Sequence, residues 1–331
     1  MRRRPARLLA SGPYAPPTAA SELSVVSADG SRLHAELHGP EGAPAVVLVH
    51  GWTCSTAFWA PVVRELAADH RVVLYDQRGH GRSPAVGPGG YSTHALADDL
   101  AAVLEQTLPP GERAVVVGHS MGGMTLMAAA DRPQLRERAA AALLCNTGAS
   151  RLIDRGRVVP LRGERLRTRV QRALLCSSAP FGPITPLSRR LLKYVTMGPA
   201  AAPAVVAACA GIVHACPRAV RAAWARVIGE LDLEAEVGRL ALPTAVLAGT
   251  ADRLTPPEHA RALAARLPRC VGLTELDGLG HMAPVEDPAA VSRVIRDLVA
   301  TYGRETPEWA DHAERDTTDG TETETTKEPT T

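Results

Sequence analysis

The chain has 331 residues, of which 45% are hydrophobic and 22% are charged. That balance is typical of a soluble globular protein with one large core, or a core and an inserted subdomain. Lys and Arg number 37 against 35 acidic residues, a net charge of +2, so the composition gives no reason to expect nucleic acid as a partner. No stretch reaches the roughly 18 uninterrupted apolar residues of a membrane-spanning helix, and we expect no integral membrane segment.

The two ends of the chain differ in composition from the rest. Three arginines follow Met1, and a proline-rich run to Pro17 leaves no apolar region for a signal peptide. We predict a flexible N-terminal arm over residues 1–20. The end of the chain is rich in threonine and acidic residues, which predicts a disordered acidic tail over residues 304–331.

The six cysteines show no Cys-x-x-Cys pair and no metal-ligand spacing with histidine. We therefore expect buried free thiols and no metal site. Buried free thiols also favour a cytoplasmic location.

The first part of the chain alternates between strand and helix patterns. Asp29-Gly30 predicts a hairpin of two opening strands. Apolar runs predict further strands, and apolar residues at helical spacing predict the helices between them; in chain order these elements are a strand over 45–49, a helix over 56–69, a strand over 72–75, a helix over 93–106 and a strand over 114–117. Strands that are apolar throughout and separated by helices indicate a parallel sheet.

After a further strand over 140–145, the alternation stops. Residues 146–237 are helical in character and interrupted by prolines, and we interpret them as an inserted helical cap. Alternation then returns, with a closing helix near 288–302. We predict Thr255 as an N-cap whose capping box is closed by Glu258. The sequence thus predicts an α/β protein with a mostly parallel central sheet flanked by helices, its core formed by residues 21–145 and 238–303.

One serine stands between a buried strand and a helix. In Gly118-His119-Ser120-Met121-Gly122, the glycines allow strand and helix to pass closely enough to expose the Ser120 hydroxyl on a tight turn. A hydroxyl is a weak nucleophile at neutral pH. It needs a histidine base, an acid that orients this base, and donors for an oxyanion.

Several motifs resemble those of the α/β-hydrolase fold family, in its serine hydrolase or esterase branch with a cap domain. They are His50-Gly51, Asp76-x-Arg78-Gly79-x-Gly81-x-Ser83, Gly118-His119-Ser120-Met121-Gly122-Gly123, Gly249-x-x-Asp252 and Gly280-His281. The resemblance runs from about Ser24 to Tyr302. It implies a catalytic triad in the chain order Ser120, Asp252, His281.

The sequence offers one candidate for the acid and one for the base, each at the position that a catalytic triad of this family requires. Asp252 follows the strand over 244–248, at the end of the sheet where open α/β proteins place their active sites. His281 lies in a glycine-rich loop after the last strand. Asn146 stands where some family members carry the acid, but an amide is not ionised, so Asp252 is preferred. Glu286 is expected to shape the loop of His281.

The resemblance also implies an oxyanion hole and a pocket. The backbone N–H groups of Trp52 and Met121 would hold the oxyanion, Met121 because it starts a helix whose dipole favours negative charge. Gly51, His119 and Trp224 are predicted to line the substrate pocket. His50 and the loop over 76–83 are expected to brace the structure.

The predicted function is hydrolysis of esters with small or medium acyl groups through an acyl-enzyme, with no metal or organic cofactor. The same triad could serve thioester hydrolysis, acyl transfer, peroxyacid formation or carbon–carbon bond hydrolysis. A ligand-binding protein on a hydrolase scaffold is the alternative from another class.

The cap begins with an arginine-rich segment between Arg151 and Arg172. A solvated helix face is the simpler interpretation. The alternative is a weak contact with anionic lipid or with an acidic carrier partner. The oligomeric state is not encoded in any pattern that we recognise.

Overall fold

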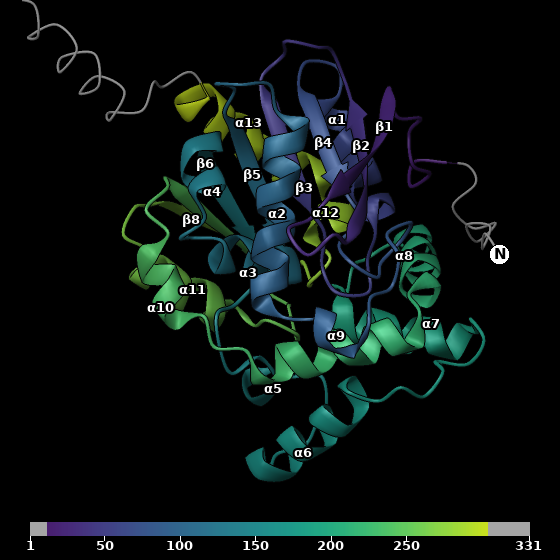
Figure 1. Cartoon of the computed structure of the whole chain (residues 1–331). Helices are drawn as coiled ribbons and strands as arrows, with labels where there is room; N and C mark the ends of the chain where they lie inside the picture. The colour runs from purple at the N-terminus through teal and green to yellow at the C-terminus, as the bar shows by residue number, and fades with distance from the viewer. Residues whose placement is uncertain (1–11, 304–331) are drawn as a thin grey trace, which may run out of the picture.

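A central sheet of eight strands organises the computed structural model, which describes residues 12–303 (Figure 1). The strand order is β1-β2-β4-β3-β5-β6-β7-β8, and the strands are β1 (Ser21–Val26), β2 (Arg32–His38), β3 (Ala45–Val49), β4 (Arg71–Tyr75), β5 (Ala114–His119), β6 (Ala139–Cys145), β7 (Thr244–Gly249) and β8 (Cys270–Leu276). Only β2 runs antiparallel to its neighbours, β1 and β4. The predicted mostly parallel sheet is confirmed.

Helices cover both faces of this sheet. They are α1 (Ala60–Leu66), α2 (Thr93–Thr107), α3 (Met121–Ala128), α4 (Pro133–Arg138), α11 (Pro257–Arg266), α12 (Ala283–Glu286) and α13 (Pro288–Tyr302), with short 3₁₀ helices η2 (Thr56–Trp59) and η3 (Pro88–Gly90). Successive residues of a strand point to opposite faces, so Val46 and Leu48 pack in one hydrophobic cluster while Val47 and Val49 pack in the other. This explains why the strands read as apolar throughout.

The helical segment between β6 and β7, which we call the cap, contains α5 (Leu152–Arg155), α6 (Glu164–Leu175), α7 (Pro186–Thr196), α8 (Pro203–Ala215), α9 (Arg218–Glu230) and α10 (Glu234–Arg239). In Figure 1, α6, α7 and α9 lie below the sheet, and α6 projects away from it. A β-bridge between Ser150 and Asp232 joins the two ends of the cap.

Within residues 12–303, no single helix is both long and apolar enough to cross a bilayer. The helices α8 and α9 reach the required length and hydrophobicity only when they are counted together, and they are bent by 95° relative to each other.

Three features of the structure differ from what the sequence patterns predict. The helix expected over 56–69 is a 3₁₀ turn followed by a shorter α-helix that ends at Leu66. Two cysteines are not buried, since Cys176 is partly exposed and Cys270 is exposed, although all six are free thiols. The helix expected to be capped by Thr255 starts at Pro257 and has no side-chain cap.

The predicted flexible arm is only partly described. Residues 12–20 contact the core, because Arg64 donates to the carbonyl oxygen of Ala15 (2.7 Å) and the Ala20 N–H donates to that of Leu37 (2.8 Å). The first bond attaches the arm to α1, and the second continues the pairing of β1 with β2. The rest of the arm and the predicted tail, residues 1–11 and 304–331, lie outside the described residues.

Candidate active site

Ser120 occupies a strained turn between β5 and α3. Its φ is 52° and its ψ is −115°, a conformation that costs a residue with a side chain roughly 1–3 kcal/mol. Hydrogen bonds hold it there: its N–H donates to the carbonyl oxygen of Cys145 (2.9 Å), and its own carbonyl oxygen accepts from Thr147 Oγ1 (2.7 Å). Ser120 remains 8% exposed, so its hydroxyl sits at the edge of the packed interior.

The glycines beside Ser120 are required by close backbone contacts. A Cβ on Gly118 would lie 2.5 Å from the backbone of Gly122, and a Cβ on Gly122 would lie 2.1 Å from the carbonyl oxygen of Val49. Both distances are impossible for a real side chain. The strand and the helix therefore approach each other only because these positions are glycine.

Asp252 and His281 form a buried pair. Asp252 Oδ2 lies 2.8 Å from His281 Nδ1, and the two residues are 2% and 4% exposed. Burial alone would raise the pKa of Asp252, but the adjacent His281 and the hydrogen bonds that the carboxylate accepts bring it below its usual value. An ionised Asp252 orients the imidazole through Nδ1 and leaves Nε2 as the basic nitrogen of the neutral ring.

Two further side chains hold the carboxylate of Asp252, and neither role was foreseen. Asn146 Nδ2 donates to Asp252 Oδ2 (3.0 Å) and to the carbonyl oxygen of Gly280 (3.1 Å). Thr255 Oγ1 donates to Asp252 Oδ2 (2.8 Å) instead of capping α11. Asn146, which stands where some family members carry the acid, thus binds the carboxylate of Asp252.

His119 connects the serine turn to the loop of His281. Its Nε2 donates to the carbonyl oxygen of His281 (2.8 Å), and the two rings lie 5.0 Å apart. Within residues 12–303, Ser120 Oγ and His281 Nε2 form no direct hydrogen bond. Such contacts are often long in unliganded enzymes and shorten when substrate binds.

The two backbone N–H groups expected to hold an oxyanion have no acceptor in the described part of the chain. Met121 is the first residue of α3, where N–H groups have no partner within the helix. Trp52 lies in the turn closed by the Cys54 N–H, which donates to the carbonyl oxygen of Gly51 (3.1 Å). Both groups are available to a ligand.

The three residues predicted to line a pocket have different positions. Gly51 lies against Ser120, since a Cβ there would be 3.0 Å from Ser120 Cβ. His119 is 1% exposed and packs on Phe58, with ring centroids 4.5 Å apart. Burial and the neighbouring His281 lower the pKa of His119 to about 3, so its ring is neutral.

The third residue, Trp224, makes its contacts in the interior of the protein. Trp224 is fully buried, and its Nε1 donates to the carbonyl oxygen of Arg78 (3.2 Å). Its ring packs edge-on against Tyr91. The rings of His119 and Trp224 are thus both buried against other aromatic side chains.

The bracing roles expected for His50 and for the loop over 76–83 agree with their contacts. His50 Nε2 accepts from the Gln77 N–H (3.0 Å). Asp76 Oδ1 accepts from the Thr56 N–H and Oδ2 from the Arg82 N–H, each at 2.8 Å. These bonds fix the loop over 76–83 against the sheet.

Glu286 ties the loop of His281 to the cap. Its Oε1 accepts from the Gly280 N–H (3.1 Å), and its Oε2 accepts from the Gly198 N–H (2.7 Å). The Met282 N–H also donates to the carbonyl oxygen of Thr196, the last residue of α7. The position of His281 therefore depends on the cap as well as on the core.

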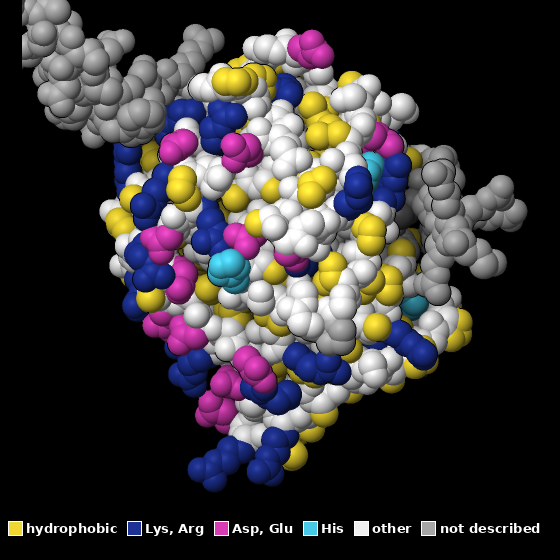
Figure 2. Space-filling model, in the orientation of Figure 1, with side chains coloured by type: hydrophobic (Ala, Val, Ile, Leu, Met, Phe, Trp, Pro, Cys, Tyr) yellow, Lys and Arg dark blue, Asp and Glu magenta, His cyan; other side chains and the backbone are white. Residues whose placement is uncertain are grey.

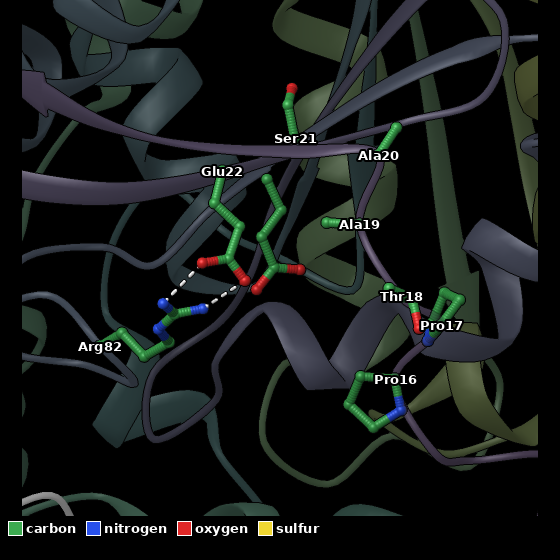
Figure 3. A pocket seen from close by; sticks show the side chains of 9 residues that line it. Pro16, Pro17, Thr18, Ala19, Ala20, Ser21, Glu22 and Arg82 are labelled. Atoms are coloured by element: carbon green, nitrogen blue, oxygen red, sulfur yellow. Dashed lines mark hydrogen bonds and ion pairs between the residues drawn. The ribbon is translucent and has the colours of Figure 1, made fainter.

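The cavity in Figure 3 lies elsewhere, beside β1 at the edge of the sheet. It has a volume of about 410 Å³ and contains an ion pair in which Arg82 makes two 2.6 Å hydrogen bonds to Glu22. Glu22, His34 and Glu36 have ligand atoms within 4.8 Å of one another and could hold a metal ion by distance alone. Their atoms already pair with one another and with Arg82, so we assign no metal to them.

Comparison with known proteins finds a match to the model of the α/β-hydrolase fold over residues 44–288. The RutD protein of Variovorax paradoxus (strain S110), which is named for a carbamate hydrolase activity, is 32% identical over 282 residues, covering 81% of this chain and 96% of its own. Two solved structures are each 26% identical with a TM-score of 0.68. They are a thermophilic esterase from Thermogutta terrifontis (86% of this chain, 100% of its own) and the esterase RhEst1 from Rhodococcus sp. ECU1013 (85% and 99%).

Proposed function

Because this chain belongs to the α/β-hydrolase family and is a hydrolase, we propose that it cleaves carboxylic esters of small or medium acyl groups through a triad of Ser120, His281 and Asp252. The observation that carries this proposal is the buried 2.8 Å contact between Asp252 and His281. The backbone of His281 is bound by the side chain next to the strained Ser120. Nucleophile, base and acid thus lie on loops that contact one another.

The reaction would proceed through an acyl-enzyme. Ser120 Oγ attacks the ester carbonyl carbon while His281 Nε2 takes its proton, and the negatively charged oxygen is bound by the N–H groups of Trp52 and Met121. The C–O bond to the alcohol breaks as His281 returns the proton to the leaving oxygen. Water, activated by the same histidine, then hydrolyses the acyl-enzyme and frees the acid.

Asp252 keeps the imidazole oriented throughout these steps. Its low pKa keeps it ionised at neutral pH, so it stabilises the imidazolium that forms when His281 accepts the serine proton. His119 is neutral and buried, and its Nε2 is engaged by a carbonyl oxygen. It is therefore a positioning residue and not a competing base.

The solved relatives support an ester as substrate, since two esterases match nearly the whole fold. Carbamate hydrolysis is the second candidate, because the RutD relative is similar over almost all of its length. Both substrates present a carbonyl to the same nucleophile. The same triad could also serve thioester hydrolysis, acyl transfer, peroxyacid formation or carbon–carbon bond hydrolysis. The triad alone does not distinguish these reactions from ester hydrolysis, so substrate assays must do so.

The test compares kcat/KM for p-nitrophenyl esters of increasing acyl length with that for a p-nitrophenyl N-alkylcarbamate. We expect the esters to be preferred, and Ser120→Ala to lower turnover by a factor of at least about 10⁴. Ser178→Ala, at an exposed serine of the cap, is the matched control and should retain full activity. A higher kcat/KM for the carbamate would favour the second candidate, and absence of Ser120-dependent turnover in folded protein would favour a ligand-binding role.

A further inference from the structure

Exposed apolar side chains are concentrated in one part of the cap. Of the ten large hydrophobic residues that are exposed in the described chain, all but Val26, Val271 and Leu273 lie between residues 161 and 194. Single exposed hydrophobic residues are normal on a soluble protein, whereas a cluster of them marks an interaction site. We call residues 161–194, which include α6 and α7, the cap face.

The apolar residues of the cap face follow helical spacing. On α7, Leu187, Leu191 and Tyr194 are spaced i, i+4 and i+7, and the two leucines are 75% and 62% exposed. On α6, Leu166 and Leu174 are eight residues apart and each 58% exposed. Residues at these spacings share one side of a helix. Both helices therefore present an apolar stripe to solvent instead of to the core.

The same segment carries a large positive charge. It has one acidic residue, Glu164, against eight basic ones, a net charge of +7; the basic residues are Arg162, Arg165, Arg167, Arg169, Arg172, Arg189, Arg190 and Lys193. None of the eight forms an ion pair with an acidic side chain within residues 12–303. The whole chain has a net charge of only +2, so positive charge is concentrated in the cap face.

We propose that the cap face binds the surface of an anionic membrane. Apolar stripes on helices rich in arginine fit such a surface, because the leucines enter the boundary of the acyl chains while the guanidinium groups contact phosphates. Figure 2 shows hydrophobic side chains gathered along the lower edge of the molecule, over the cap, with Lys and Arg side chains beside them. This lipid contact is a binding activity beyond the proposed hydrolysis.

The positive charge of the cap face favours an anionic lipid surface, and not a second copy of the chain, as its binding partner. A symmetric dimer through the cap face would bring the arginines of one copy against those of the other, since a two-fold interface uses the same surface twice. Like charges facing each other oppose association. An anionic bilayer neutralises the same charges.

The cap face is connected to the candidate active site by α7. This helix ends at Thr196, whose carbonyl oxygen accepts from the N–H of Met282, the residue after His281. An eleven-residue helix is about 16 Å long. A molecule bound through the cap face would therefore hold its histidine loop within about one helix length of the lipid.

Co-sedimentation of the full chain with vesicles tests the proposal. We expect binding to vesicles of equal parts phosphatidylcholine and phosphatidylglycerol, weak or no binding to phosphatidylcholine alone, and weaker binding as salt increases. The double variant Leu187→Ser and Leu191→Ser should lower affinity for the anionic vesicles by at least about tenfold. The pair Val271→Ser and Leu273→Ser, at exposed hydrophobic residues of β8, is the matched control and should bind like the wild type.

Three results would overturn the proposal. They are equal binding to neutral and anionic vesicles, no binding to either, and unchanged binding of the Leu187 and Leu191 variant. Sedimentation velocity would reveal a dimer that this variant disrupts, which would assign the cap face to a second copy instead. Turnover of a soluble p-nitrophenyl ester should be the same in the variant and the wild type, so a failure of lipid binding is distinguishable from a failure of the proposed hydrolysis.

Discussion

The carboxylate of Asp252 is held by more partners than a simple acid–base pair requires. Its Oδ1 accepts from the N–H groups of Leu254 and Thr255, and its Oδ2 accepts from Asn146, Thr255 Oγ1 and His281. Each donor favours the ionised form and fixes the plane of the carboxylate. The direction in which His281 points is therefore set in part by the buried residues Asn146 and Thr255.

Replacing Thr255 tests this positioning role. Thr255→Val keeps the shape of the side chain but removes the hydroxyl donor, so we expect kcat for an ester to fall about 10- to 100-fold with little change in KM, because the histidine loses its alignment. Thr255→Ser should restore most of kcat. If Thr255→Val left kcat unchanged, the hydroxyl would have no part in orienting the acid.

At the scale of elements, the loop over 76–83 is locked to α2 by a buried ion pair. Arg78 Nε and Nη2 donate to Asp99 at 2.7 and 2.5 Å, and both side chains are inaccessible to solvent. Trp224 of α9 adds a bond from the cap to the carbonyl oxygen of Arg78. One arginine thus joins a core helix, the loop and the cap.

Breaking this pair should destabilise the fold strongly. Asp99→Ala would leave the Arg78 guanidinium buried without its main partner, and we expect the free energy of unfolding to fall by about 3–5 kcal/mol. The neighbouring Asp98 pairs with His94 and Arg132 at the surface, so Asp98→Ala should cost at most about 1 kcal/mol. Denaturant unfolding of both variants measures the difference, and equal losses would contradict the special role of the buried pair.

At the scale of the whole molecule, stability should respond to the titration of Asp76. Burial raises the pKa of Asp76 from 3.8 to about 6, so the folded protein binds a proton more tightly than the unfolded chain does. This contribution is fully present below the unfolded pKa and is lost as pH rises through about 6. Lowered carboxyl pKa values, such as that of Asp252, act in the opposite direction and are lost as pH falls.

A comparison with Asp76→Asn isolates that contribution. The wild type should lose stability relative to this variant, by about 2–3 kcal/mol, as pH rises from about 4 to about 8. Chemical unfolding of both proteins at several pH values gives the difference directly. A difference that is constant with pH would mean that the pKa of Asp76 is the same in the folded and unfolded states.

Patterns along the chain were sufficient to predict the sheet but not the orientation of several side chains. Strands buried on both faces must be apolar throughout, so 45–49 and 114–117 could be recognised from their residues alone. Thr255 was assigned to a cap because the same Thr-Pro-Pro-Glu pattern fits a helix start. Its actual partner, Asp252, is three residues away, and the bond depends on how the turn after β7 holds that carboxylate through the Leu254 and Thr255 N–H groups.

Long-range packing also decides which side chains are buried and which are exposed. His119 and Trp224 turn inward because their partners, Phe58 and the carbonyl of Arg78, come from distant parts of the chain. The leucines of α6 and α7 have the spacing of a core-facing stripe, and only the fold shows that they face solvent. A pattern of apolar residues predicts that one side of a helix is buried, but it does not say against what.

The central claim is that Ser120 is a nucleophile activated by His281, and covalent labelling tests it most directly. Intact-protein mass would be measured after exposure to a fluorophosphonate, for the wild type, Ser120→Ala and His281→Gln, with circular dichroism to show that each variant is folded. We expect one adduct on the wild type, none on Ser120→Ala, and labelling slowed by at least about 10³-fold in His281→Gln. No adduct on folded wild type, or an adduct that persists in Ser120→Ala, would contradict the claim.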